Sequence, residues 1–255
     1  MGTTRLILHT DSRKQSDINT FRNAAITLAK TYKIKYPKQA YIVKVIFVKN
    51  GKEIVDAINA VGRNNLVSLD IVSHGNQGGI HISRNLKPPE KAGLIKQNVH
   101  FQIRKESDNP QTMSDAEYME ESMHGLYTDK VSRLGVSYYY NQTYDSSPFI
   151  ATLDDIKFDV FSENAVIEFH GCRTAEIIPI LNTWLKDNFA AKFSSKLGKK
   201  GTVIGHITNT APDKNPNGNV NDYRYGKVRI YKDGELLKDS IERWKYKLPN
   251  SSTPH

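Results

Sequence analysis

The only cysteine of the chain, Cys172, follows an apolar run and a glycine in the stretch VIEFHGCRTAE, Val166 to Glu176. A second apolar run, LVSLDIVSHG from Leu66 to Gly75, ends in His74-Gly75. A thiol becomes an effective nucleophile when a base assists it or when its surroundings favour the thiolate. Cys172 and His74 are therefore the candidate nucleophile and base of an acyl-transfer site. The alternative for Cys172 is an inert thiol that fills space in the core.

The elements around these residues predict an α/β fold with a mostly parallel sheet and helices on both faces, because apolar β-branched runs alternate with helical periodicity. The C-terminal stretch KVRIYKDGELL predicts a β-hairpin that turns at Asp233-Gly234. The expected strands cover 5–9, 41–48, 66–72, 165–170 and 201–205, and the expected helices cover 17–32, 53–61, about 153–156 and a segment after Cys172 that includes Ile177 to Leu185.

The order of these elements explains how His74 and Cys172 meet although they lie far apart in sequence. Ligands of an open α/β sheet bind at the carboxyl ends of its strands, where neighbouring strands would bring the imidazole and the thiol together. Gly75 and Gly171 allow a substrate backbone to come close and leave amide N–H groups to hold an oxyanion. The start of the helix expected after Cys172 would favour a thiolate through its dipole.

The chain reads as a single domain over 1–248, with an insertion at about 83–147 and a disordered tail at 249–255. In the insertion, charged and polar residues, Pro88-Pro89 and the run Tyr138-Tyr139-Tyr140 replace clean periodicity. A structureless loop of that length is rare inside a compact domain, so we expect it to carry short elements of its own. It would gate the site or be cleaved on activation.

An apolar strand with His-Gly, followed later by an apolar strand, a small residue and Cys, resembles the caspase-like (clan CD) cysteine peptidases. FHGCRTA, Phe169 to Ala175, is also similar to the cysteine block of the self-processing protease domains of large bacterial toxins. The stretch YGKVRIYKDGELLKDSIERW, Tyr225 to Trp244, resembles the β-flap hairpin of those domains. The resemblance covers Arg5 to about Val72, His74 to Gly79 and Thr152 to Trp244.

This resemblance implies a caspase-like fold and a role for individual residues. Cys172 would be the nucleophile and His74 the base, with the amides of Gly75 and Cys172 as oxyanion donors. The resemblance implies that the S1 pocket is lined by Asp11, His170 and the loop at Thr208-Asn209. In that loop, Asn209 is the candidate for contact with the substrate. Asp11 is alternatively the acidic residue that orients His74.

Two departures from the clan leave the substrate preference open. The insertion is longer than usual, and His170 stands where several clan members set the P1 charge. Asp11 favours a basic P1 residue, whereas His170 argues against one. His170 is alternatively a second imidazole acting on the thiol, His124 is expected at the surface, and His206 is expected to be a core histidine with its hydrogen bonds satisfied.

The chain carries a net charge of +9, since Lys and Arg number 36 against 27 Asp and Glu. An excess of this kind suits an anionic partner, but a solvated basic surface is the simpler explanation and the one we favour. By the resemblance to the toxin proteases, the basic hairpin is a polyphosphate-sensing surface and inositol hexakisphosphate is its activator. The residues of that expected surface are Lys227, Arg229, Lys232 and Arg243, with Lys238, Lys245 and Lys247 near them.

Other classes fit the sequence less well. The stretch GCRTA lacks the G-x-nucleophile-x-G elbow of an α/β-hydrolase, and no H-E-x-x-H pattern supports a zinc hydrolase. No nucleic-acid-binding signature accompanies the charge, so nucleic acid is an unlikely partner, and a non-catalytic basic module for nucleic acid or polyphosphate is the alternative.

We expect a cysteine endopeptidase that acts on a protein substrate and needs no metal or other cofactor. A bacterial protease toxin or effector with self-processing is the setting that the resemblance implies. No apolar run of membrane-spanning length and no signal peptide is found, so the protein is expected in the cytoplasm or delivered without a cleaved signal.

Overall fold

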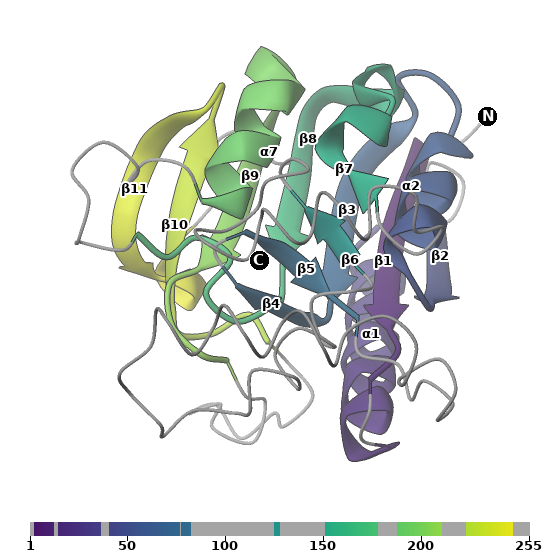
Figure 1. The fold of residues 1–255 in the computed structure, drawn as a ribbon. Helices are drawn as coiled ribbons and strands as arrows, with labels where there is room; N and C mark the ends of the chain where they lie inside the picture. Colours follow the sequence, from purple (N-terminus) through teal and green to yellow (C-terminus); the bar gives the residue numbers. More distant parts are fainter. Residues whose placement is uncertain are drawn as a thin grey trace, which may run out of the picture.

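The computed structural model describes residues 3–12, 15–36, 41–76, 78–82, 125–127, 151–177, 188–210 and 223–246. A seven-stranded sheet with the order β11-β10-β9-β8-β3-β1-β2 forms its centre (Figure 1). Its strands are β1 (Thr3–Thr10), β2 (Tyr41–Val48), β3 (Leu66–Val72), β8 (Phe161–Phe169), β9 (Gly201–His206), β10 (Lys227–Lys232) and β11 (Glu235–Glu242).

Neighbouring strands in the series β2-β1-β3-β8-β9 pair in parallel. Strands β10 and β11 add an antiparallel edge next to β9. The central strands are rich in Val, Ile, Leu and Phe because both faces of the sheet are covered. The mostly parallel sheet, the expected strands and the C-terminal hairpin are confirmed.

Helices cover both faces of the sheet. Helix α1 (Gln15–Lys35) packs on β1, β2 and β3 through an apolar stripe that includes Phe21, Ala25 and Leu28. Helices α2 (Gly51–Asn59) and α7 (Phe189–Leu197) share the main core of the opposite face. In that core, Phe169 of β8 packs against the rings of Phe189 and Phe193. Short 3₁₀ turns lie at Leu153–Asp155, Phe158–Val160, Gly198–Lys200 and Arg243–Lys245.

The sequence did not predict α7 as a separate helix. Its N-cap is Asn188, whose side chain accepts a hydrogen bond from the amide of Ala191. Within the predicted helix after Cys172, residues 178–187 lie outside the described part of the chain.

A second, four-stranded sheet has the order β4-β5-β6-β7 and lies on the α2 side of the molecule. It comprises β4 (His74–Asn76), β5 (Gly79–His81), β6 (Gly125–Tyr127) and β7 (Ala151–Thr152). The stretch after β3, expected to be a glycine-rich loop, is therefore a hairpin that begins at His74. Strand β6 comes from the expected insertion, whose other residues lie almost entirely outside the described ranges, as do Lys247 and the expected tail at 249–255.

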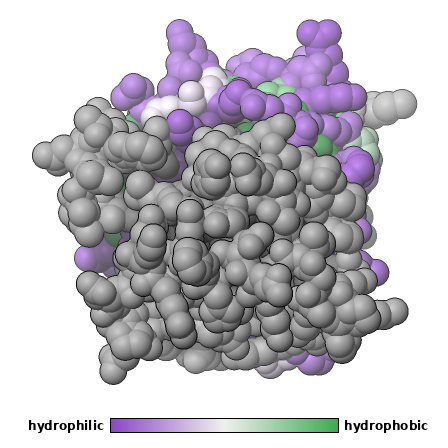
Figure 2. Space-filling model, in the orientation of Figure 1, coloured by the Kyte–Doolittle hydropathy of each residue, from purple (hydrophilic) through white to green (hydrophobic). Residues whose placement is uncertain are grey.

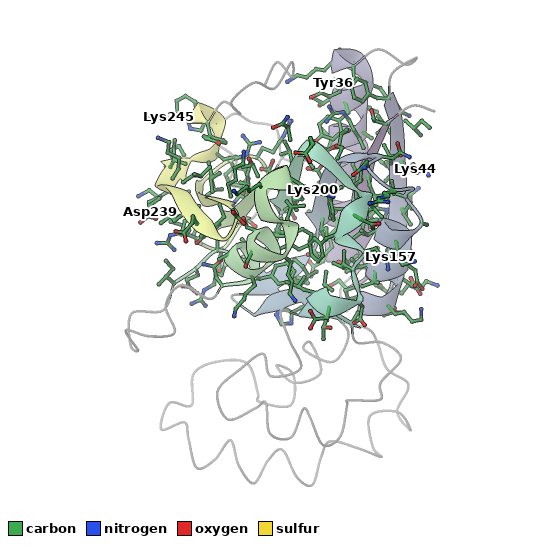
Figure 3. All side chains as sticks on the ribbon, turned by 90° about the horizontal axis from the view of Figure 1, so that it is seen from above. Tyr36, Lys44, Lys157, Lys200, Asp239 and Lys245 are labelled. Carbon is green, nitrogen blue, oxygen red and sulfur yellow. The ribbon has the colours of Figure 1, made fainter. Side chains whose placement is uncertain are left out.

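The C-terminal hairpin turns where the sequence predicts. Asp233 and Gly234 have φ angles of 54° and 78°, the left-handed geometry that a two-residue hairpin turn requires. Lys44 on β2 and Asp239 on β11 mark the two edges of the sheet in Figure 3.

The space-filling view in Figure 2 shows mostly hydrophilic side chains along the upper rim of the described surface. No helix among the described residues has the length and the apolar character needed to cross a membrane.

Candidate active site at the ends of β3 and β8

The ends of β3 and β8 lie against each other, as the sequence predicts. The two strands pair in parallel with Ile71 opposite Phe169, and the amide of His170 donates to the Ile71 carbonyl at 2.9 Å. A Cβ atom placed on Gly171 would lie 3.3 Å from the Gly75 nitrogen and Cα. A Cβ atom on Gly75 would lie 3.2 Å from the Cys172 carbonyl oxygen. Two glycines thus allow His74-Gly75 and Gly171-Cys172 to meet backbone to backbone.

The imidazole of His74 is held by residues that follow β1. Its Nε2 lies 3.2 Å from a carboxylate oxygen of Asp17 and 3.2 Å from the hydroxyl of Ser12, which itself donates to Asp17. The ring of Phe21 packs edge-on against the imidazole, with centroids 5.0 Å apart. Asp17 and Phe21 lie four residues apart, so both reach His74 from one face of α1.

The acidic residue beside His74 is Asp17 and not Asp11, which the resemblance offered for that role. A carboxylate oxygen of Asp11 accepts a hydrogen bond from the amide of Ser12. The sequence suggested Asp17 only as a helix cap, and the structure places it in the first turn of α1. The contact of Asp17 with His74 could have been predicted from the strand order. Strands β1 and β3 are neighbours, so the helix that follows β1 starts beside the end of β3.

The sulfur of Cys172 contacts the loop that follows β9. The amide of Thr210 donates to Sγ at 3.3 Å, and the carbonyl and hydroxyl oxygens of Thr210 lie 3.6 and 3.8 Å from it. Cys172 is half-buried, whereas Asn209 is exposed. The loop at Thr208-Asn209, expected to line the S1 pocket, therefore lies beside Cys172.

A strained turn follows Cys172. Arg173 has a φ of 56°, which a residue with a side chain rarely adopts. Its amide donates to the Thr208 carbonyl at 3.2 Å, and its guanidinium makes two bonds to Glu176, at 2.6 and 2.7 Å. These contacts hold the turn in place. Residues 172–175 form this turn, and the helix expected over Ile177 to Leu185 lies almost entirely outside the described part of the chain.

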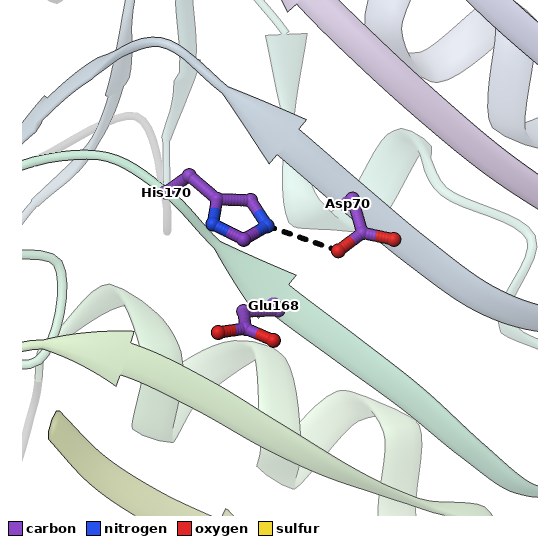
Figure 4. A group of neighbouring side chains, drawn as sticks. All are labelled: Asp70, Glu168 and His170. Atoms are coloured by element: carbon purple, nitrogen blue, oxygen red, sulfur yellow. Dashed lines mark hydrogen bonds and ion pairs between the residues drawn. The ribbon is translucent and has the colours of Figure 1, made fainter. Parts of the chain in front are cut away.

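His170 is buried, with 2% of its side chain exposed. Its Nε2 bonds Asp70 of β3 at 2.9 Å (Figure 4). Asp70 also accepts a hydrogen bond from the hydroxyl of Tyr32 at 2.8 Å. A side chain that is buried and bound in this way does not line a surface pocket. Two roles proposed for His170, in the S1 pocket and as a second imidazole acting on the thiol, therefore lose their support. The alternation of side chains explains the difference, because His170 shares the face of Glu168.

Glu168 is paired with a residue that was expected to bind polyphosphate. Arg243 makes two hydrogen bonds to its carboxylate, at 2.6 and 2.8 Å, and both side chains are almost fully buried. Burial alone would raise the pKa of Glu168, but the nearby Arg243 and its hydrogen bonds hold that pKa well below the usual range. Arg243 is therefore corrected from a surface ligand to the buried partner of Glu168.

Oxygen and nitrogen atoms of Asp70, Glu168 and His170 lie within 4.8 Å of one another, a spacing compatible with a metal ion (Figure 4). The partners of these atoms argue against a metal, since Asp70 binds His170 and Tyr32 while Glu168 binds Arg243. The guanidinium already supplies the cation, so the donor set does not fit a metal site.

His206 lies at the end of β9 and is fully buried, so its place in the core is confirmed. Neither ring nitrogen has a hydrogen-bond partner among the described residues, so the expectation of satisfied hydrogen bonds stays a prediction. Burial, with a smaller contribution from His170, lowers the pKa of His206 to about 3 and keeps it neutral.

The remaining residues of the expected polyphosphate surface lie on β10. Arg229 bonds Asp239 at 2.7 Å and the carbonyl of Ala175 at 2.9 Å, so its charge is largely satisfied. Lys227 is exposed and Lys232 is half-exposed. The hairpin therefore keeps its lysines at the surface, while its two arginines bind within the protein.

Comparison of the chain with models of protein families, with curated proteins and with solved structures finds no match.

Proposed function

We propose that the protein is a cysteine endopeptidase with Cys172 as nucleophile and His74 as base. The observation that carries this proposal is the contact between Gly75 and Gly171, which brings the two reactive residues to one point of the sheet edge. The Asp17 and Ser12 side chains on His74 support it further, because a base needs a partner that fixes its tautomer. The resemblance to caspase-like peptidases agrees with this arrangement.

The proposed mechanism uses both nitrogens of His74. The N–H group at Nε2 donates a hydrogen bond to the Asp17 carboxylate. This tautomer leaves Nδ1 unprotonated, so that it accepts the proton of the Cys172 thiol. The sulfur then forms a bond to the carbonyl carbon of the substrate, and the amides of Gly75 and Cys172 bind the oxyanion. The C–N bond breaks as His74 protonates the leaving amine. Water next attacks the acyl-enzyme, and His74 transfers a proton of that water back to the sulfur.

We assign a protein substrate with a basic P1 residue. Asp11 is partly exposed directly after β1 and binds the amide of Ser12, whose hydroxyl contacts His74, so it supplies a negative charge on this side of the site. His170 no longer opposes this assignment, since it is buried beside Asp70. Self-processing within 83–147 and the setting of a bacterial toxin or effector remain part of the proposal.

Exposed lysines favour a second, regulatory function for the hairpin. Lys227, Lys238 and Lys245 are exposed, and the ammonium of Lys245 lies over the exposed ring of Trp244 at 5.0 Å from its centroid. A polyphosphate such as inositol hexakisphosphate would bind there as an activator, without Arg229 or Arg243. If Cys172 is not catalytic, the same surface supports the alternative of a non-catalytic module for an anionic partner.

The test is to incubate wild-type protein and the Cys172→Ala variant with a cell lysate, with and without inositol hexakisphosphate, and to map new N-termini by mass spectrometry. Termini that follow Lys or Arg and vanish in the variant would support the peptidase and its P1 residue. Termini after acidic or apolar residues would contradict the basic P1. Identical profiles under all conditions would contradict the peptidase.

A further inference from the structure

The loop after β9 reaches the sulfur of Cys172 because of the order of the strands. Strand β9 pairs in parallel with β8, so both strands end at the same edge of the sheet. The loop is anchored by the bond between the Arg173 amide and the Thr208 carbonyl. Two residues further on, Thr210 contacts Sγ through its amide at 3.3 Å and its hydroxyl at 3.8 Å.

The contacts of Thr210 differ in which form of the Cys172 sulfur, thiolate or neutral thiol, they favour. An amide N–H is a donor only, so its bond to sulfur is strongest when the sulfur is a thiolate. A hydroxyl can turn its proton toward the same thiolate. The Thr210 carbonyl is an acceptor and favours the neutral thiol, but it lies at 3.6 Å from the sulfur, further than the amide nitrogen. Thr210 therefore brings two hydrogen-bond donors to the sulfur of Cys172 from the loop after β9.

We propose that Thr210 is a further catalytic residue, whose amide and hydroxyl hold the Cys172 sulfur as a thiolate aimed at the substrate. This inference rests on the proposed peptidase function. The contact is made to the reacting atom, the sulfur of Cys172. Thr210 donates hydrogen bonds to that sulfur, whereas His74 removes the proton of the thiol.

The experiment measures the rate at which iodoacetamide alkylates Cys172, because this rate reports thiolate reactivity without requiring any peptidase activity. Thr210→Val removes the hydroxyl and keeps the amide, and Thr210→Pro removes the amide donor. Thr202→Val, at the other end of β9, is the matched control that removes a threonine hydroxyl away from Cys172. Thr210→Ser restores the hydroxyl. Thermal melting of each variant shows whether the fold is retained.

We expect Thr210→Val to slow alkylation at pH 6.5 by about 3-fold and Thr210→Pro by about 10-fold, relative to the control. Thr210→Ser should restore the wild-type rate, and kcat on a cleaved peptide should fall while KM stays constant.

Equal alkylation rates for the Thr210 variants and the control, in proteins that still cleave, would overturn the role of Thr210 and leave the peptidase standing. Alkylation that depends on Thr210 in a wild-type protein that cleaves nothing would overturn the peptidase and, with it, the catalytic role of Thr210. A loss of kcat without any change in alkylation would also contradict the proposal.

Discussion

Two His-Gly pairs end neighbouring strand regions, and each histidine binds an aspartate, but the two sites differ in exposure. His74 and Asp17 lie 3.2 Å apart with 37% and 31% of their side chains exposed. His170 and Asp70 lie 2.9 Å apart with 2% of each exposed. The first pair lies at the edge of the sheet, where a substrate can reach it, and the second lies beneath the sheet. Burial, and not the dipeptide or the partner, separates a candidate catalytic histidine from a structural one.

The buried pair belongs to a wider charge network. Glu168 and Arg243 lie beside it, and Tyr32 completes the coordination of Asp70. Buried charges of this kind need partners, because an unpaired one is strongly destabilising. The network therefore supports the strand end that carries Gly171-Cys172, while the proposed chemistry uses the exposed pair.

The largest effect is expected where the same substitution is made at each histidine. His74→Gln should lower kcat/KM by roughly 10²–10⁴-fold with little change in the melting temperature, because it removes the base. His170→Gln should lower the melting temperature and leave kcat of the folded protein within a few-fold of wild type. Peptide cleavage assays and thermal melts on both variants measure the contrast. Equal losses of kcat would show that the comparison is wrong.

The buried network is tested by removing one charge. Glu168→Gln should lower the free energy of unfolding by about 3–5 kcal/mol, since Arg243 would remain buried without its anion. Urea denaturation measures this loss. The double variant Glu168→Gln/Arg243→Met should recover much of it, because it removes both charges. A single variant as stable as wild type would contradict the account of this pair.

The contact between the strand ends is tested at Gly75. A Cβ atom there would lie 2.8 Å from the Thr174 methyl carbon and 3.2 Å from the Cys172 carbonyl oxygen. Gly75→Ala should therefore destabilise the protein by about 1–3 kcal/mol and lower activity through displacement of Cys172. Thr174→Ser removes the methyl group, so the double variant should regain part of both. A fully active and stable Gly75→Ala would show that the two strand ends do not meet closely.

The smallest effect is a pH dependence from His206. Its pKa is lowered to about 3 in the folded protein, whereas an unfolded histidine titrates near 6.5. The unfolded chain then binds a proton that the folded protein does not, so stability is complete above pH 6.5 and falls as the pH drops toward 3. The slope is about 1.4 kcal/mol per pH unit for this residue.

Urea denaturation between pH 6.5 and 5 measures this slope before Glu168 begins to contribute. The pKa of Glu168 is lowered in the folded state, so its stabilisation is lost only as the pH falls below the usual carboxylate range. His206→Gln should reduce the slope between pH 6.5 and 5 and leave the contribution of His9, whose pKa is also lowered by burial. An unchanged slope in that variant would contradict a neutral, buried His206.

Much of the fold could be predicted because hydrophobic periodicity and turn residues act locally. The strands at 41–48 and 66–72 and the turn at Asp233-Gly234 follow from their own residues. The sequence also predicted that the ends of β3 and β8 lie close together, because the carboxyl ends of parallel strands meet at one edge of a sheet. The hairpin at His74 was missed, since the pairing of β4 with β5 shows no strong pattern in so short a stretch.

The partners of the candidate site could not be predicted to the same degree. Asp17 resembles an ordinary helix start, and Thr210 belongs to a loop with no periodicity, so only tertiary packing reveals their contacts with His74 and Cys172. Arg243 looks like one more basic residue of the hairpin until Glu168 is found opposite it. Long-range pairs of this kind depend on the register of distant strands.

Covalent labelling by a peptidyl acyloxymethyl ketone with Lys at P1, read by intact mass and peptide mapping, tests Cys172 as the nucleophile of a peptidase. We expect one label per chain on Cys172, no label in Cys172→Ala, and labelling slowed at least about 100-fold in His74→Gln. A Cys172 that iodoacetamide alkylates but that the ketone leaves unlabelled at every P1 residue tried would contradict a cysteine peptidase at this site.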